Sequence, residues 1–101
     1  MKKTAPLTKD IILDFLRTQK PLLKKKFGVT KIALFGSYAR NEAKKSSDID
    51  LLIEVTKKSF NNTYALKEYL EKHFNKKVDI GYFDCVRTYV FHHIQEDLIY
   101  A

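Results

Sequence analysis

Residues 34–55, LFGSYARNEAKKSSDIDLLIEV, contain the features that decide the fold. An apolar run ends at Gly36-Ser37, a polar connector follows, and a second apolar run begins through Asp48 and Asp50. Aspartate is disfavoured inside strands, so two of them at the start of an apolar strand need a reason. Because side chains alternate between the two faces of a strand, both carboxylates point to the same side. The stretch therefore predicts two strands joined by a connector, with an acidic pair where the second strand begins.

The rest of the chain predicts helices around these strands. Thr8 is a candidate N-cap, Pro21 separates a first helix from a second, and Gly28 is a candidate C-terminal glycine for the second. The residues after Ser37 predict a short helix or a turn. The predicted elements are helices over 9–20, 21–27, 63–74 and 86–99 and strands over 30–35, 48–55 and 76–83. Helices and strands are mixed, so we expect one α/β (α+β) domain over 1–101, with a small mixed sheet flanked by helices.

The composition limits the classes of protein that fit. A length of 101 residues with 45% apolar residues suits one globular domain, and no apolar run is long enough to cross a bilayer. The apolar positions near the N-terminus are interrupted by Asp14 and Arg17, unlike a signal peptide, so we expect a cytoplasmic protein. The net charge of +7 fits either a polyanionic partner or a solvated lysine-rich surface. No recognised nucleic-acid-binding motif accompanies the lysines, which makes nucleic acid the weaker alternative.

The acidic residues suggest a metal site. Two carboxylates on one face repel each other, and Mg²⁺ is the simplest partner, since it binds through a few carboxylates and completes its shell with substrate phosphates. Taken alone, Asp48-x-Asp50 also occurs in ordinary surface turns. Asp79 interrupts the third predicted strand in the same way. If that strand lies beside the second, the three carboxylates suit a two-metal site for phosphoryl chemistry, with one of them also able to accept a proton.

Gly36 and Ser37 suggest the other half of such a site. A glycine at the end of a strand lets the backbone approach a ligand closely, and the N-terminus of a following helix favours phosphate. Ser37 adds a hydroxyl donor, while Arg40 either reaches a phosphate or is solvated at the surface.

Together these residues form a known signature. Gly36-Ser37, ten further residues and Asp48-x-Asp50 match the GS-x10-DxD pattern, so the chain resembles the polymerase-β-like nucleotidyltransferase superfamily. The longer string LFGSYARNEAKKSSDIDLLIE is similar to the minimal nucleotidyltransferases of bacteria and archaea, and the similarity extends over the whole chain. It implies the polymerase-β-like nucleotidyltransferase fold, in a single minimal domain.

The resemblance also implies a function. Such proteins are similar to the antitoxins of two-gene modules whose toxin is a small helical ribonuclease of the HEPN type, and they transfer AMP from ATP to a tyrosine of that toxin. By position, Asp48, Asp50 and Asp79 would be catalytic and would bind Mg²⁺, two ions in all. Gly36, Ser37 and Arg40 would bind the nucleotide. The implied partners are ATP and the cognate toxin, in a hetero-oligomer, with no membrane.

One position departs from the family pattern, and three alternatives stay open. The family has glycine where this chain has Asn41, and asparagine tolerates left-handed backbone conformations better than most residues. The first alternative is an antitoxin that neutralises its toxin by binding, with little or no catalysis. The second is transfer to a small-molecule acceptor such as an aminoglycoside, and the third is nucleic-acid binding through the lysines.

Overall fold

The computed structural model describes residues 7–101, apart from the side chain of Tyr89; residues 1–6 of the predicted domain lie outside the described part. The elements, in order, are α1 (Lys9–Thr18), α2 (Lys20–Phe27), β1 (Val29–Phe35), β2 (Ile49–Val55), α3 (Phe60–Phe74), β3 (Val78–Tyr82), the 3₁₀ turn η1 (Phe83–Cys85), α4 (Thr88–Ile94) and β4 (Ile99–Tyr100). The four strands form one sheet in the order β3-β2-β1-β4. β2 and β3 are parallel, and the other two pairs are antiparallel. The mixed sheet confirms the predicted α+β class.

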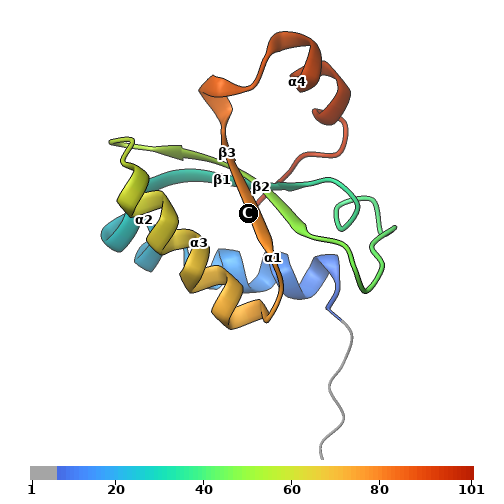
Figure 1. Ribbon diagram of the computed structural model, residues 1–101, viewed down its shortest axis with the longest axis horizontal. Helices are drawn as coiled ribbons and strands as arrows, with labels where there is room; N and C mark the ends of the chain where they lie inside the picture. Colours follow the sequence, from blue (N-terminus) through green and yellow to red (C-terminus); the bar gives the residue numbers. More distant parts are fainter. Residues whose placement is uncertain (1–6) are drawn as a thin grey trace, which may run out of the picture.

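The helices divide between the two faces of the sheet. Helices α1, α2 and α3 lie together on one face, and the chain through η1 and α4 passes over the other (Figure 1). Alternate residues of β2 determine this division: Ile49, Leu51 and Ile53 are fully buried in the core beneath the three helices. Asp50 therefore points to the opposite face, the face on the side of η1 and α4.

The local signals at the N-terminal helices act as predicted. Thr8 caps α1, since its side-chain oxygen accepts a hydrogen bond from the N–H of Ile11 at 3.3 Å. Pro21 lies in the first turn of α2, where proline needs no hydrogen-bond partner for its nitrogen. Gly28 ends α2 in the left-handed conformation, with φ of 70°. These two short helices bring the chain directly into β1. None of the described helices is long and apolar enough to span a membrane.

The prediction of a single helix over 86–99 is wrong. α4 covers only Thr88–Ile94, and the chain then turns into β4, where Ile99 pairs with Leu34 and Tyr100 with Ala33. Tyr100 also stacks on Phe83, with ring centroids 5.7 Å apart. Strand pairing and aromatic packing thus outweigh the helical spacing of the apolar residues in this segment. As a result, the turn before β4 lies beside the loop that follows β1.

Candidate active site

Three carboxylates gather where β2 begins. Asp50 pairs with Asp79 in the parallel register of β2 and β3, so the two side chains lie next to each other on the same face. Asp48 precedes β2 by one residue and is half-buried, as is Asp50, whereas Asp79 is exposed. The structure therefore brings together the three acidic residues singled out from the sequence. We call Asp48, Asp50 and Asp79 the carboxylate row.

Asp50 is the residue of the row whose pKa this arrangement shifts. Partial burial raises the pKa of Asp50 above its ordinary value, and repulsion from Asp79 and then Asp48 raises it further. The positive charge of Arg40 opposes these effects. The row is therefore a site where additional positive charge would be stabilising.

The donor set fits a hard divalent cation. Carboxylate oxygens are the ligands that Mg²⁺ prefers, and Mg²⁺ commonly takes only one or two carboxylates from the protein. Within residues 7–101, no group of three or more aspartate, glutamate, histidine or cysteine side chains is arranged so that it could hold a metal ion. The row by itself is therefore not a formed metal site, and a cation held by one or two of its carboxylates would complete its shell with water or substrate oxygens.

Gly36 brings the loop after β1 against this row. Its φ is 80°, and a Cβ atom on Gly36 would lie 2.3 Å from Oδ2 of Asp50. Phe35, the last residue of β1, pairs with Asp50 across the sheet, which is why the loop starts at this point. Only glycine allows both the left-handed backbone and the close approach. The two halves of the sequence signature are therefore in direct contact.

The residues after Gly36 form a tight turn and not a regular helix. The N–H of Arg40 donates to the carbonyl of Gly36 at 3.2 Å, and the N–H of Glu42 donates to the carbonyl of Ser37 at 2.8 Å. Tyr38 and Ala39 are buried and anchor the turn in the core. The N–H groups of Ser37, Tyr38 and Ala39 donate to no acceptor in the described part of the chain. These unpaired amides stand in the place of the helix N-terminus that the sequence offers as one possibility.

Asn41 takes the left-handed conformation expected of it, with φ of 59°. We expect Asn41→Gly to raise the free energy of unfolding by about 0.5 kcal/mol, because glycine removes the steric cost of a left-handed residue. Urea unfolding of both proteins measures the difference. A less stable glycine variant would show that the Asn41 side chain makes a contribution of its own.

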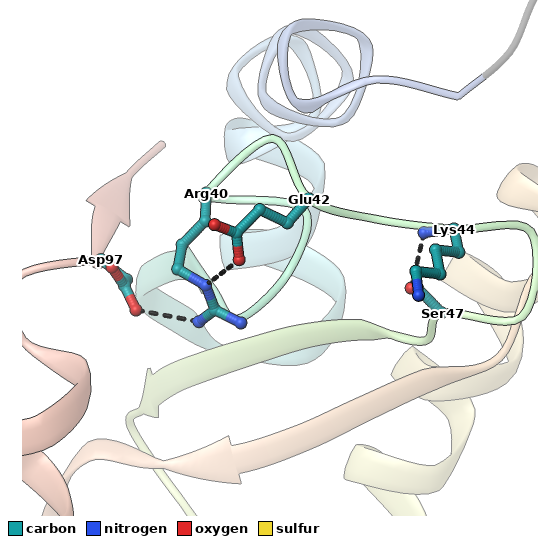
Figure 2. Close-up of polar contacts among 5 residues, drawn as sticks. All are labelled: Arg40, Glu42, Lys44, Ser47 and Asp97. Carbon is teal, nitrogen blue, oxygen red and sulfur yellow. Dashed lines mark hydrogen bonds and ion pairs between the residues drawn. The ribbon is translucent and has the colours of Figure 1, made fainter.

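Arg40 is held by two carboxylates. Its Nε donates to Oε1 of Glu42 at 2.9 Å, and its Nη1 donates to Oδ2 of Asp97 at 3.0 Å (Figure 2). Asp97 lies in the turn between α4 and β4, 57 residues from Arg40. Asp97 was not predicted from the sequence, because no local pattern links it to Gly36-Ser37 and Asp48-x-Asp50.

A lysine between α3 and β3 contacts the connector that leads to Asp48. Within the connector, the N–H of Lys44 donates to the hydroxyl of Ser47 at 2.8 Å (Figure 2). Lys76, just before β3, donates to the carbonyls of Lys45 at 2.6 Å and Ser47 at 3.1 Å. These contacts fix the path into the carboxylate row. The sequence analysis did not assign this role to Lys76.

Comparison with known families identifies the family of this chain. The family model of the nucleotidyltransferase domain matches residues 16–100. The chain belongs to the nucleotidyltransferase family. The matched residues include the loop after β1 that begins with Gly36 and Ser37, which we call the signature loop, together with the carboxylate row and β4. The predicted family and the predicted class of enzyme are confirmed.

Relatives with a more specific name cover nearly the whole chain. MJ1379 of Methanocaldococcus jannaschii, provisionally named a protein adenylyltransferase, is 45% identical over 94 residues, which are 89% of this chain and 94% of the relative. The protein adenylyltransferase MntA of Thermococcus cleftensis is 33% identical over 98 residues, 96% of this chain and 99% of the relative. This nucleotidyltransferase is therefore similar over its length to proteins named for adenylyl transfer.

Solved structures share the fold. A provisionally named minimal nucleotidyltransferase superposes with a TM-score of 0.78 at 23% identity, covering 95% of this chain and 98% of that one. A toxin–antitoxin crystal structure of MntA and HpeT gives a TM-score of 0.66 at 19% identity, covering 93% and 72% of the two chains. A toxin–antitoxin structure with AMP-PNP gives 0.59 at 24%, covering 83% and 64%. These matches confirm the predicted nucleotidyltransferase fold.

The electrostatics of the row predict an effect on stability. Because the pKa of Asp50 is raised in the folded protein, the folded state holds this proton more tightly than the unfolded state. The protonated Asp50 carboxyl therefore contributes folding stability that is fully present below the ordinary pKa of aspartate. This contribution is lost as the pH rises through the raised pKa. We therefore expect Asp50→Asn to raise the melting temperature at neutral pH, in a chelating buffer.

The gain in melting temperature of Asp50→Asn should disappear as the pH falls below the ordinary pKa of aspartate, where the wild-type carboxyl is also neutral. Thermal melts of both proteins across pH measure it. Asp14→Asn, on the exposed side of α1, is the control for charge removal. A neutral-pH melting temperature that falls in Asp50→Asn would contradict the electrostatic interpretation.

Proposed function

We propose that this protein is a magnesium-dependent protein adenylyltransferase and an antitoxin. It would transfer AMP from ATP to a tyrosine hydroxyl of a cognate HEPN ribonuclease toxin. The observation that carries the proposal is the pairing of Asp50 with Asp79 directly beside Gly36. This pairing puts candidate metal ligands and candidate phosphate-binding amides next to each other, as transfer between a nucleotide and a hydroxyl requires.

Each residue of the site has a role in this proposal. The unpaired amides of Ser37, Tyr38 and Ala39 would bind the triphosphate, together with the Ser37 hydroxyl and Arg40. The carboxylate row would hold Mg²⁺, two ions in all. When bound, the metal supplies positive charge that polarises the phosphate and stabilises the attacking and leaving oxygens.

The reaction is a displacement at the α-phosphorus of ATP. The tyrosine oxygen forms a bond to that phosphorus, the bond to the bridging oxygen breaks, and pyrophosphate leaves. Asp79, the most exposed residue of the carboxylate row, is our candidate for accepting the hydroxyl proton. Its exposure leaves room for a protein acceptor to approach.

The relatives support the choice of acceptor and partner. Proteins at 33–45% identity are named protein adenylyltransferases, and structural neighbours are named as toxin–antitoxin complexes, one of them with AMP-PNP. On this basis we assign ATP as the nucleotide and a toxin as the acceptor. We also propose that residues 1–101 act as one domain, in the cytoplasm, as a hetero-oligomer with the toxin.

The test combines the purified protein with the candidate toxin encoded next to it, Mg²⁺ and ATP labelled in its adenosine. We expect label on the toxin, and no label when the toxin tyrosine is replaced by phenylalanine. Asp84→Asn is the matched control. Asp84 lies on η1 and is exposed, and its Oδ2 is 2.7 Å from Nζ of Lys58. A toxin that stays unlabelled with the wild-type protein would overturn the proposal.

Growth rescue separates modification from binding. We expect Asp48→Asn to fail to rescue cells that express the toxin, while Asp84→Asn rescues them. Full rescue by Asp48→Asn would show that the protein neutralises its toxin mainly by binding, and would overturn the proposed role of catalysis.

A further inference from the structure

Arg40 has one largely exposed partner and one mostly buried partner. Glu42 is two residues away in the same exposed turn, and its side chain is 66% exposed. The Asp97 side chain is only 24% exposed and belongs to a different part of the chain. An arginine held by Glu42 alone would keep much of the freedom of an exposed side chain, so Asp97 is the contact that fixes its position.

Asp97 is itself well anchored. Its N–H donates to the carbonyl of Ile94 at 2.9 Å, which closes the turn after α4. β4 begins two residues later and pairs with β1. The carbonyl of Tyr100 accepts a hydrogen bond from Arg17 on α1 at 3.3 Å. Asp97 is therefore fixed to the same strand, β1, from which the signature loop emerges.

Arg40 belongs to the turn that begins at Gly36, beside the carboxylate row. The N–H of Arg40 donates to the carbonyl of Gly36 at 3.2 Å, and a Cβ atom on Gly36 would lie 2.3 Å from Oδ2 of Asp50. Nε and Nη1 are taken by the two carboxylates. The other terminal nitrogen has no partner among the described residues, and no dashed line reaches it in Figure 2. One end of the guanidinium is thus available for a phosphate oxygen.

We propose that Asp97 is a positioning residue for nucleotide binding: by pairing with Arg40 it holds the guanidinium beside the carboxylate row, with one nitrogen directed to the triphosphate. The proposal rests on the proposed function, since it assumes that the site takes ATP. It also makes the turn between α4 and β4 part of the nucleotide site.

The experiment measures ATP affinity directly. Isothermal titration of the full chain with ATP and Mg²⁺ needs no toxin. We expect Asp97→Asn to weaken ATP binding about tenfold, the scale of one charged hydrogen bond. Asp97→Glu should restore most of the affinity. Asp84→Asn, which removes a comparable surface ion pair away from the signature loop, should bind ATP like the wild type.

A double-mutant cycle tests whether Asp97 acts through Arg40. We expect Arg40→Gln/Asp97→Asn to bind ATP no more weakly than Arg40→Gln alone. In the transfer assay, Asp97→Asn should raise KM for ATP and leave kcat within about twofold, because it affects binding and not the reacting atoms. A thermal melt of each variant checks its fold.

The outcomes are distinct. Unchanged affinity in Asp97→Asn, or additive effects in the double variant, would overturn the proposal while leaving the proposed function intact. Tighter binding would show that Asp97 competes with phosphate for Arg40, which also overturns it. A wild-type protein that does not bind ATP would overturn the proposed function as well.

Discussion

Replacing Asp50 by asparagine should reduce AMP transfer to the toxin by about 10³-fold or more, because it removes the central charge of the carboxylate row. Asp50 lies between Asp48 along the chain and Asp79 across the sheet. Asparagine keeps the shape of the side chain but binds a divalent cation far more weakly. Initial rates with labelled ATP, at saturating Mg²⁺, measure the loss.

The stability of Asp50→Asn tests whether unfolding explains its loss of activity. We expect Asp50→Asn to be at least as stable as the wild type at neutral pH, so unfolding cannot account for lost activity. Asp48→Asn and Asp79→Asn should also lose activity, whereas Asp84→Asn should not. An Asp50→Asn protein that transfers AMP at the wild-type rate would rule out the carboxylate row as the catalytic site.

Replacing Gly36 by alanine should lower kcat/KM by about 10²-fold, the cost of displacing reactive groups by about 1 Å. The new Cβ would lie 2.3 Å from Oδ2 of Asp50, a distance that real Cβ contacts do not reach. Either the Asp50 carboxylate or the signature loop has to move. Both are parts of the site, so activity should fall even where the fold persists.

Gly28→Ala is the matched control for this variant. Gly28 has a similar φ of 70°, and a Cβ there would lie 2.8 Å from Oγ1 of Thr56, away from the carboxylate row. Both variants should lose roughly 1 kcal/mol of stability from backbone strain. Only Gly36→Ala should lose transfer activity. Equal activity in the two variants would contradict the close contact between Gly36 and Asp50.

The site could be predicted from sequence where its parts are local. Gly36-Ser37 and Asp48-x-Asp50 lie within fifteen residues at the ends of two adjacent strands, so their spacing can be recognised in the sequence. Asp79 follows from one further assumption, that β3 lies beside β2, and the parallel register confirms it. These residues interrupt apolar runs, and that interruption is the signal.

The C-terminal contacts of the loop that follows β1 could not be predicted in this way. β4 has only two residues, which is too short for an alternating pattern to distinguish it from the end of a helix. Its pairing with β1 depends on contacts across most of the chain, and the same is true of the ion pair between Arg40 and Asp97. Long-range pairing leaves no mark in local composition, so Asp97 became visible only in the structure.

Nucleotidyl transfer at the site formed by Gly36 and the carboxylate row places the α-phosphate of ATP on the acceptor. The most direct test compares ATP labelled at the α-phosphate with ATP labelled at the γ-phosphate, each incubated with the protein, the toxin and Mg²⁺. We predict that only the α-label appears on the toxin, with release of pyrophosphate, and that Asp50→Asn abolishes it. Transfer of the γ-label, or α-labelling that persists in Asp50→Asn, would contradict the claim.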